Sequence, residues 1–77
     1  MSVRDDLRDV VTLLVDERER VEIDEQLQGE RNTLEVSVVE DDLGKVIGRQ
    51  GRTARALRRF LAARGASGRA WDLKILD

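Results

Sequence analysis

The sequence predicts a two-layer α+β domain with the element order α-β-β-α-α-β. Three observations lead to this prediction. Two segments that alternate apolar and polar residues are joined by a short glycine-containing segment, which is typical of an antiparallel hairpin. Three other segments repeat their apolar residues with the period of a helix. A last alternating run follows, so we expect a three-stranded mixed sheet covered on one face by three helices.

The first half of the chain predicts one helix and one hairpin. Residues 3–16 carry apolar side chains at the spacing of one helical face, and Ser2 is placed to cap this helix. Residues 20–27 alternate, residues 33–39 alternate again, and the polar segment 28–32 lies between them. We therefore expect two half-buried strands joined by a turn.

The second half predicts a pair of helices. A short helix over about 42–47 is expected to be capped by Asp41 or Asp42, because aspartate accepts hydrogen bonds from the first free N–H groups of a helix. A longer helix is expected from about 52 to 64. Its inward face comprises Ala54, Leu57 and Leu61, flanked by Phe60.

A final strand follows the longer helix. The segment 65–68 contains two glycines and is expected to end that helix, and residues 71–75 alternate again. Because a helical crossover joins this strand to the strand at 33–39, the two should be parallel. Trp71 and Phe60 are the only aromatic residues, and both are expected in the core rather than on a base-stacking surface.

The composition excludes several classes of protein. A chain of 77 residues is expected to form one domain, 1–77. It contains no cysteine and no histidine, which excludes the usual zinc ligand sets and Ser-His-Asp or Cys-His catalysis. No apolar stretch is long enough to span a bilayer, and the N-terminus lacks the apolar segment of a secretory signal. We therefore predict a protein that is not an enzyme and that needs no metal or cofactor.

Charge is divided unevenly along the chain. Residues 1–42 contain 5 basic and 14 acidic side chains, whereas residues 43–77 contain 9 basic and 2 acidic ones. No acidic residue occurs between Leu43 and Trp71. The net charge of −2 hides this asymmetry, which indicates an anionic partner for the second half.

The basic half contains a Gly-x-x-Gly segment, Gly48 to Gly51, between two predicted helices. Gly48 is expected in a left-handed conformation that ends the first helix, and Gly51 lets another backbone approach closely. The second helix begins with free N–H groups and the positive end of its dipole, which together favour an anion. The cations around this segment are Lys45, Arg49, Arg52 and Arg55.

Two other glycine-rich motifs do not fit this segment. A P-loop requires Lys followed by Ser or Thr after its last glycine, but Arg52 follows Gly51 and Val46 follows Lys45. A dinucleotide-binding fingerprint requires Gly-x-Gly-x-x-Gly directly after a strand, and here a predicted helix precedes the loop.

The stretch Gly-Lys-Val-Ile-Gly-Arg-Gln-Gly-Arg-Thr-Ala, between two helices in this element order, resembles the core motif of the KH domain. The order of helices and strands resembles the type II KH fold, and the whole chain is similar in layout to small bacterial single-KH-domain RNA-binding proteins of the KhpA type. The resemblance implies a groove that holds about four single-stranded nucleotides. It also implies a cytoplasmic RNA chaperone or regulator that pairs with a second KH protein.

The resemblance assigns roles to particular residues. Gly48 and Gly51 would let the nucleic-acid backbone come close, Arg49 and Gln50 would face phosphates, and Ile47 would lie beneath the bases. Two further cations, Arg52 and Arg55, would sit at the start of the following helix. The complete set of expected RNA-binding residues is Lys45, Ile47, Gly48, Arg49, Gln50, Gly51, Arg52 and Arg55.

Several questions remain open in the sequence. Lys45 is either a phosphate contact or a favourable charge at a helix C-terminus. The acidic region 16–25 is either a solvated edge, a surface that repels nucleic acid, or a contact for a basic partner. Single-stranded DNA is an alternative ligand. The alternative function is a protein-interaction or dimerisation module on a KH scaffold, as a homodimer or with a second KH protein.

Overall fold

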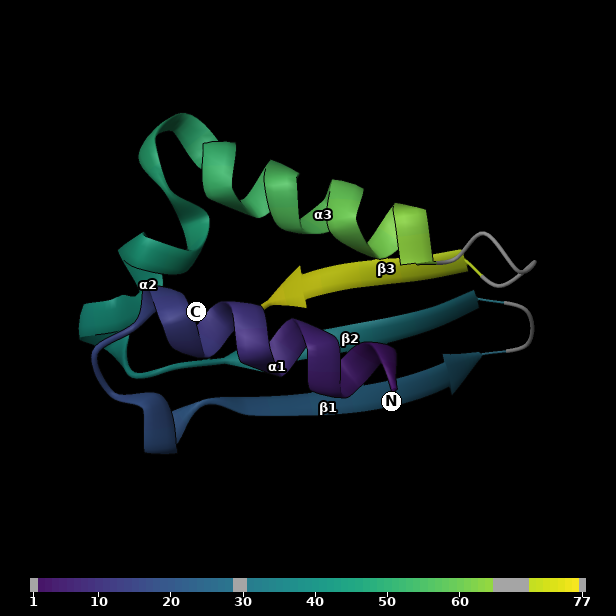
Figure 1. Ribbon diagram of the computed structural model, residues 1–77, viewed down its shortest axis with the longest axis horizontal. Helices are drawn as coiled ribbons and strands as arrows, with labels where there is room; N and C mark the ends of the chain where they lie inside the picture. Colours follow the sequence, from purple (N-terminus) through teal and green to yellow (C-terminus); the bar gives the residue numbers. More distant parts are fainter. Residues whose placement is uncertain (1, 29–30, 65–69, 77) are drawn as a thin grey trace.

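A computed structural model describes residues 2–28, 31–64 and 70–76 (Figure 1). In chain order its elements are α1 (Val3–Leu14), a 3₁₀ turn (Arg18–Arg20), β1 (Glu22–Gln28), β2 (Arg31–Ser37), α2 (Glu40–Ile47), a second 3₁₀ turn (Arg49–Gly51), α3 (Arg52–Arg64) and β3 (Ala70–Ile75). The predicted α+β class and the order α-β-β-α-α-β are confirmed. The arrangement is that of a type II KH fold.

The strands form one mixed sheet in the order β1-β2-β3. β1 and β2 are antiparallel, with Ile23 opposite Val36. β2 and β3 are parallel, with Leu34 opposite Leu73. The parallel pair confirms the expectation drawn from the helical crossover, because a short hairpin cannot join parallel strands.

The predicted boundaries of the hairpin are displaced. β1 begins two residues later than expected, because Arg18–Arg20 form a 3₁₀ turn before it. The prediction of a turn over 28–32 is wrong at Gln28, which still belongs to β1, and at Arg31 and Asn32, which already belong to β2. Asn32 is of a residue type typical of turns, but β2 is the central strand, and pairing on both sides outweighs local preference. The predicted helix end at 65–68 lies outside the described residues.

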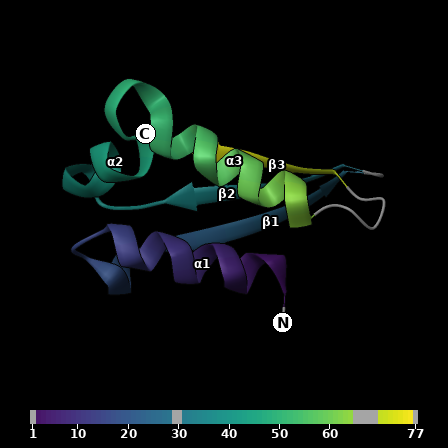
Figure 2. The same ribbon diagram turned by 45° about the horizontal axis from the view of Figure 1, so that its top comes forward.

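Helices α1 and α3 lie on the same face of the sheet, α1 over β1 and α3 over β3 (Figures 1 and 2). Alternate strand residues face these helices and are buried with residues of all three helices. The buried core comprises Leu7, Val11, Val15, Val21, Ile23, Leu34, Val36, Val46, Leu57, Leu61 and Leu73. Ala54 is also buried, and Phe60 and Trp71 pack against this core, as expected.

Helix α1 has the predicted start but a different end. The Ser2 hydroxyl oxygen accepts a hydrogen bond from the Asp5 N–H at 3.0 Å, which confirms the N-cap. The helix ends at Leu14 rather than at residue 16, because Val15 is extended and turns into the core. The two residues after Val15 are held by an acidic side chain from α2.

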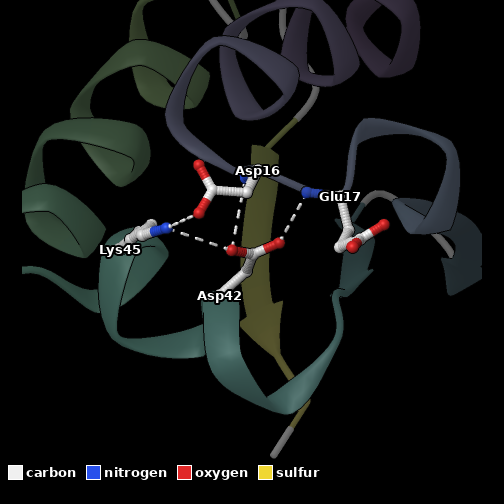
Figure 3. A network of polar contacts seen from close by, with 4 residues as sticks. All are labelled: Asp16, Glu17, Asp42 and Lys45. Carbon is white, nitrogen blue, oxygen red and sulfur yellow. Dashed lines mark hydrogen bonds and ion pairs between the residues drawn. The ribbon is translucent and has the colours of Figure 1, made fainter.

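That side chain is Asp42, whose carboxylate is buried and joins α2 to the connection after α1 (Figure 3). Its Oδ1 accepts from the Asp16 N–H at 3.2 Å, and its Oδ2 accepts from the Glu17 N–H at 2.9 Å. The prediction that Asp41 or Asp42 caps α2 is therefore wrong. Helix α2 begins at Glu40, and no side chain caps it.

The hydrogen bond from the Glu17 N–H is the main cause that lowers the pKa of Asp42 below its ordinary value of 3.8. Burial acts in the opposite direction, and the Asp16 N–H and the Lys45 amine add to the lowering. A carboxylate whose pKa is lower in the folded state stabilises the fold above its ordinary pKa. That stabilisation is lost as the pH falls through the lowered value.

Replacing Asp42 by Asn should lower the melting temperature at pH 7 by roughly 5 °C or more, because the amide has one acceptor oxygen, so its NH2 group would face one of the two backbone N–H groups. The difference from the wild type should be constant above about pH 5 and should shrink as the pH falls below 3.8. Thermal unfolding followed by circular dichroism measures both effects. The control is Asp41→Asn, which changes an exposed neighbour, and equal losses in the two variants would contradict the bridging role of Asp42.

Asn32 is a second buried polar residue, and it faces the core from β2. Neither its Oδ1 nor its Nδ2 has a hydrogen-bond partner within the described part of the chain. A buried amide without partners costs free energy that an apolar side chain at the same place would not.

Replacing Asn32 by Val should therefore raise the free energy of unfolding by about 1–2 kcal/mol. Urea denaturation should show a higher midpoint with an unchanged slope. Thr33→Val, on the opposite face of the same strand, controls for the preference of valine for strands. A lower midpoint for Asn32→Val would show that the amide contributes to stability where it lies.

Candidate nucleic-acid interface

The Gly-x-x-Gly segment forms a tight loop that projects at one end of the molecule between α2 and α3 (Figure 1). The Gly48 N–H donates to the Gly44 carbonyl at 2.8 Å and ends α2. The Gly51 N–H donates to the Gly48 carbonyl at 3.1 Å, and the Arg52 N–H donates to the Arg49 carbonyl. The sequence suggested that the free N–H groups at the start of α3 bind an anion. Two of these groups already donate to carbonyl oxygens of the loop, and α3 begins directly after it.

Position 48 requires a glycine for two reasons, its backbone conformation and the lack of space for a side chain. Its φ of 77° is positive, as expected, but its ψ of 169° places it in a region that is essentially restricted to glycine rather than in the left-handed helical region. A Cβ at this position would lie 2.7 Å from the Thr53 backbone nitrogen and 2.6 Å from the Thr53 Cβ. No side chain fits there without moving the start of α3.

Gly51 is required mainly by its backbone. Its φ is 75°, but a Cβ there would meet only the Arg55 guanidinium, at an ordinary 3.4 Å. Between the two glycines, Gln50 has a φ of 57° and a ψ of 25°, which is a left-handed conformation in a residue with a side chain. That conformation costs about 1–2 kcal/mol. Glutamine has no preference that would reveal it in the sequence.

Three arginines lie on the loop and on the first turns of α3. Arg49, Arg52 and Arg55 are exposed, and none forms an ion pair within the described residues. The first turn of α3 contains no acidic residue, so the positive end of its dipole adds to their charge. The structure therefore brings these three predicted site residues together at the loop.

Lys45 differs from the arginines. It lies in the last turn of α2, and its amine forms ion pairs with Asp16 and with Asp42, the latter at 3.3 Å (Figure 3). The hydrogen bond to Asp16 is the main cause that raises the pKa of Lys45 above its ordinary value. In the acidic region 16–25 the charged side chains are exposed, and Asp16 is the one that meets this lysine.

Apolar surface continues from the loop along α2. Ile47 is 37% exposed although its neighbour Val46 is fully buried. Leu43 lies one helical turn before Ile47, on the same side of α2. A hollow of about 420 Å³ is lined by the apolar Leu43, Val38 and Leu76 together with the polar Ser37 and Glu40. The sequence did not indicate Leu43 and Leu76 as site residues. Leu76 directly follows β3 and is 36% exposed. An apolar residue that breaks the alternation of the preceding strand is the signal that could have indicated it.

Other basic and aromatic residues of the second half lie away from the loop or serve the fold. Arg64 pairs with Asp6 of α1, and Arg58 and Arg59 are exposed on α3. Trp71 and Phe60 are partly buried against the core, so they offer no stacking platform. Within the described residues, no group of three or more His, Cys, Asp or Glu side chains is placed to hold a metal ion. In that same part of the chain, no helix has the length and apolar character to cross a membrane.

The fold and the loop together define a KH domain of type II. Comparison with family models matches residues 4–75 to the KH domain described as KhpA/KhpB. The chain therefore belongs to the KhpA/KhpB KH-domain family.

Proteins named RNA-binding protein KhpA are similar over most of the chain. The protein from Mycobacterium leprae is 47% identical over 75 residues, which covers 97% of this chain and 91% of the relative. The protein from Streptomyces coelicolor is 45% identical over 71 residues, with coverage of 92% and 90%. That from Aquifex aeolicus is 44% identical over 77 residues, with coverage of 92% and 96%. A comparison with solved structures gave no significant match.

Replacing Gly48 by Ala should lower the free energy of unfolding by about 3 kcal/mol, because a Cβ adds both backbone strain and a clash with Thr53. The matched variant Gly51→Ala should cost only about 1 kcal/mol, because its Cβ meets open space and a flexible arginine. Chemical denaturation of both variants measures the difference. Equal costs would contradict the packing of Gly48 against the start of α3.

Proposed function

We propose that this protein binds single-stranded RNA without catalysing a reaction, and that it clamps the sugar–phosphate backbone at the Gly48–Gly51 loop. The observation that carries the proposal is the placement of Arg49, Arg52 and Arg55 at a glycine-constrained turn, where none of them has an acidic partner within the described residues. Cations around a helix start favour phosphate groups. The similar proteins named RNA-binding protein KhpA support the choice of RNA.

The proposed contacts follow the geometry of the loop. Gly48 and Gly51 keep the loop thin, so that phosphates approach the backbone, and Arg49 and Gln50 lie at its tip. Arg52 and Arg55 follow on the first turns of α3 and would contact neighbouring phosphates. A strand of about four nucleotides is the length that a KH groove accommodates.

In this proposal, the bases of the bound strand lie against the apolar surface of α2. Ile47 is exposed beside the loop, and Leu43 continues the same side of the helix toward the hollow. Aliphatic side chains cover the faces of unstacked bases, and this surface needs no aromatic residue. Such contacts discriminate weakly between bases, so we propose modest sequence preference.

The absence of histidine and cysteine from the sequence supports a binding function rather than an enzymatic one. We further propose a cytoplasmic RNA chaperone or post-transcriptional regulator. One short site has limited affinity, so function would depend on a second copy or on a second KH protein. The family description, which joins two KH proteins, supports such a partner.

Replacing Arg49 and Gln50 together by Asp should weaken binding of a labelled eight-nucleotide RNA by at least about tenfold. The two new acidic side chains at the loop tip would repel phosphates, and the substitution also removes the positive charge of Arg49. Fluorescence anisotropy at several salt concentrations measures this loss. The dependence of log Kd on log salt should become shallower by about 0.7 for each phosphate that the variant no longer binds.

The matched control is Arg18→Asp with Gln26→Asp, which makes the same two changes on exposed residues of the first 3₁₀ turn and β1. Circular dichroism confirms that both double variants are folded. Equal weakening by the two variants would mean that net charge alone governs binding, and it would contradict a clamp at the loop. The same assay with DNA of equal sequence measures the preference for RNA.

A further inference from the structure

Lys45 is the one basic residue near the loop that already has acidic partners within the described residues. Its amine contacts Asp16 and Asp42 at once, whereas Arg49, Arg52 and Arg55 form no ion pair in that part of the chain (Figure 3). Two carboxylates and one amine lie together where α2 passes the connection after α1. Because Lys45 is three residues before Gly48, the cluster lies close to the proposed clamp.

The two carboxylates hold the lysine in different ways. Asp42 is 2% exposed, and both of its oxygens already accept backbone N–H groups. It remains in place and charged whether or not Lys45 is beside it. Asp16 is 80% exposed, and within the described residues the hydrogen-bond and ion-pair partner of its side chain is the lysine amine. Asp16 is therefore the partner that Lys45 can leave at low cost, because exposed ion pairs contribute little to stability.

The position of Lys45 makes an exchange of partners possible. It lies three residues before Gly48, in the last turn of α2, and its side chain is 43% exposed. A lysine amine on a flexible four-carbon stem can turn from one anion to another without moving the backbone. A phosphate that enters between the loop and α2 is an anion of the same kind as the Asp16 carboxylate.

We propose that Asp16 competes with the phosphates of the bound strand for Lys45. In the free protein Asp16 holds the amine, and on binding a phosphate takes its place, while Asp42 keeps α2 attached to the connection after α1. This inference rests on the proposed function. It makes Asp16 a residue that limits affinity without contacting nucleic acid.

The experiment compares Asp16→Asn with Asp41→Asn in the binding of the same eight-nucleotide RNA. Both changes remove one negative charge, and Asp41 is an exposed neighbour on α2 that has no ion pair within the described residues. Asp16→Asn does not change the main-chain N–H of residue 16, so its hydrogen bond to the Asp42 carboxylate is kept. We expect Asp16→Asn to tighten binding roughly 3- to 10-fold, and by clearly more than Asp41→Asn, with a salt dependence steeper by up to about 0.7.

A second experiment tests whether the gain in RNA affinity from Asp16→Asn depends on Lys45. Lys45→Met keeps the length of the side chain and removes its charge, so the gain from Asp16→Asn should disappear in the double variant. Equal effects of Asp16→Asn and Asp41→Asn would overturn the exchange, and so would a gain that persists without Lys45. In both cases wild-type binding and its loss in the loop variant would leave the proposed function intact. Absence of RNA binding by the wild-type protein would instead overturn the proposed function, and the exchange with it.

Discussion

The close approach of Gly48 to Thr53 is the constraint on which the candidate site depends. The chain leaves α2, reverses within one 3₁₀ turn and begins α3, and it does so through a backbone conformation that essentially only glycine adopts. This reversal fixes the direction of α3 relative to α2, and it sets Arg49 at the tip of the loop and Arg52 at the helix start. Three of the nine basic residues of the second half of the chain are thereby placed at the loop and on the first turns of α3.

Acidic and basic residues have different tasks in this molecule. Asp42 is buried and uses its carboxylate to hold the backbone between α1 and the first 3₁₀ turn, and Asp6 pairs with Arg64 between α1 and α3. The arginines at the loop have no such partners within the described residues. Asp42 and Asp6 thus connect elements of the fold, while the arginines at the loop face solvent. Lys45 stands between these two groups of residues, since it contacts two carboxylates and also precedes the loop.

Much of the fold follows from the sequence, because the apolar residues recur with the periods of helices and strands and so indicate which face of each element is buried. The inward face of α3, the N-cap at Ser2 and the parallel pairing of β2 with β3 are all predicted correctly. The hairpin boundaries are not, because the polar residues Arg31 and Asn32 resemble a turn until the pairing of a central strand is known.

The candidate site is predictable in part. The glycine spacing and the run of cations are enough to identify the loop from the sequence. The role of Asp42 is not visible there, because its partners are backbone N–H groups 25 and 26 residues away. The left-handed Gln50 and the ion pairs of Lys45 are likewise products of the tertiary structure.

The most direct test of a clamp at the Gly48–Gly51 loop follows the backbone amides of an isotope-labelled protein by nuclear magnetic resonance while a short unpaired RNA is added. A clamp at this loop predicts that the largest changes in chemical shift fall on Ile47 to Thr53 and continue into the first turns of α3, with small changes on β1 and the outer face of the sheet. Binding that leaves the amides of Ile47 to Thr53 unchanged, or that shifts β1 most strongly, would contradict it.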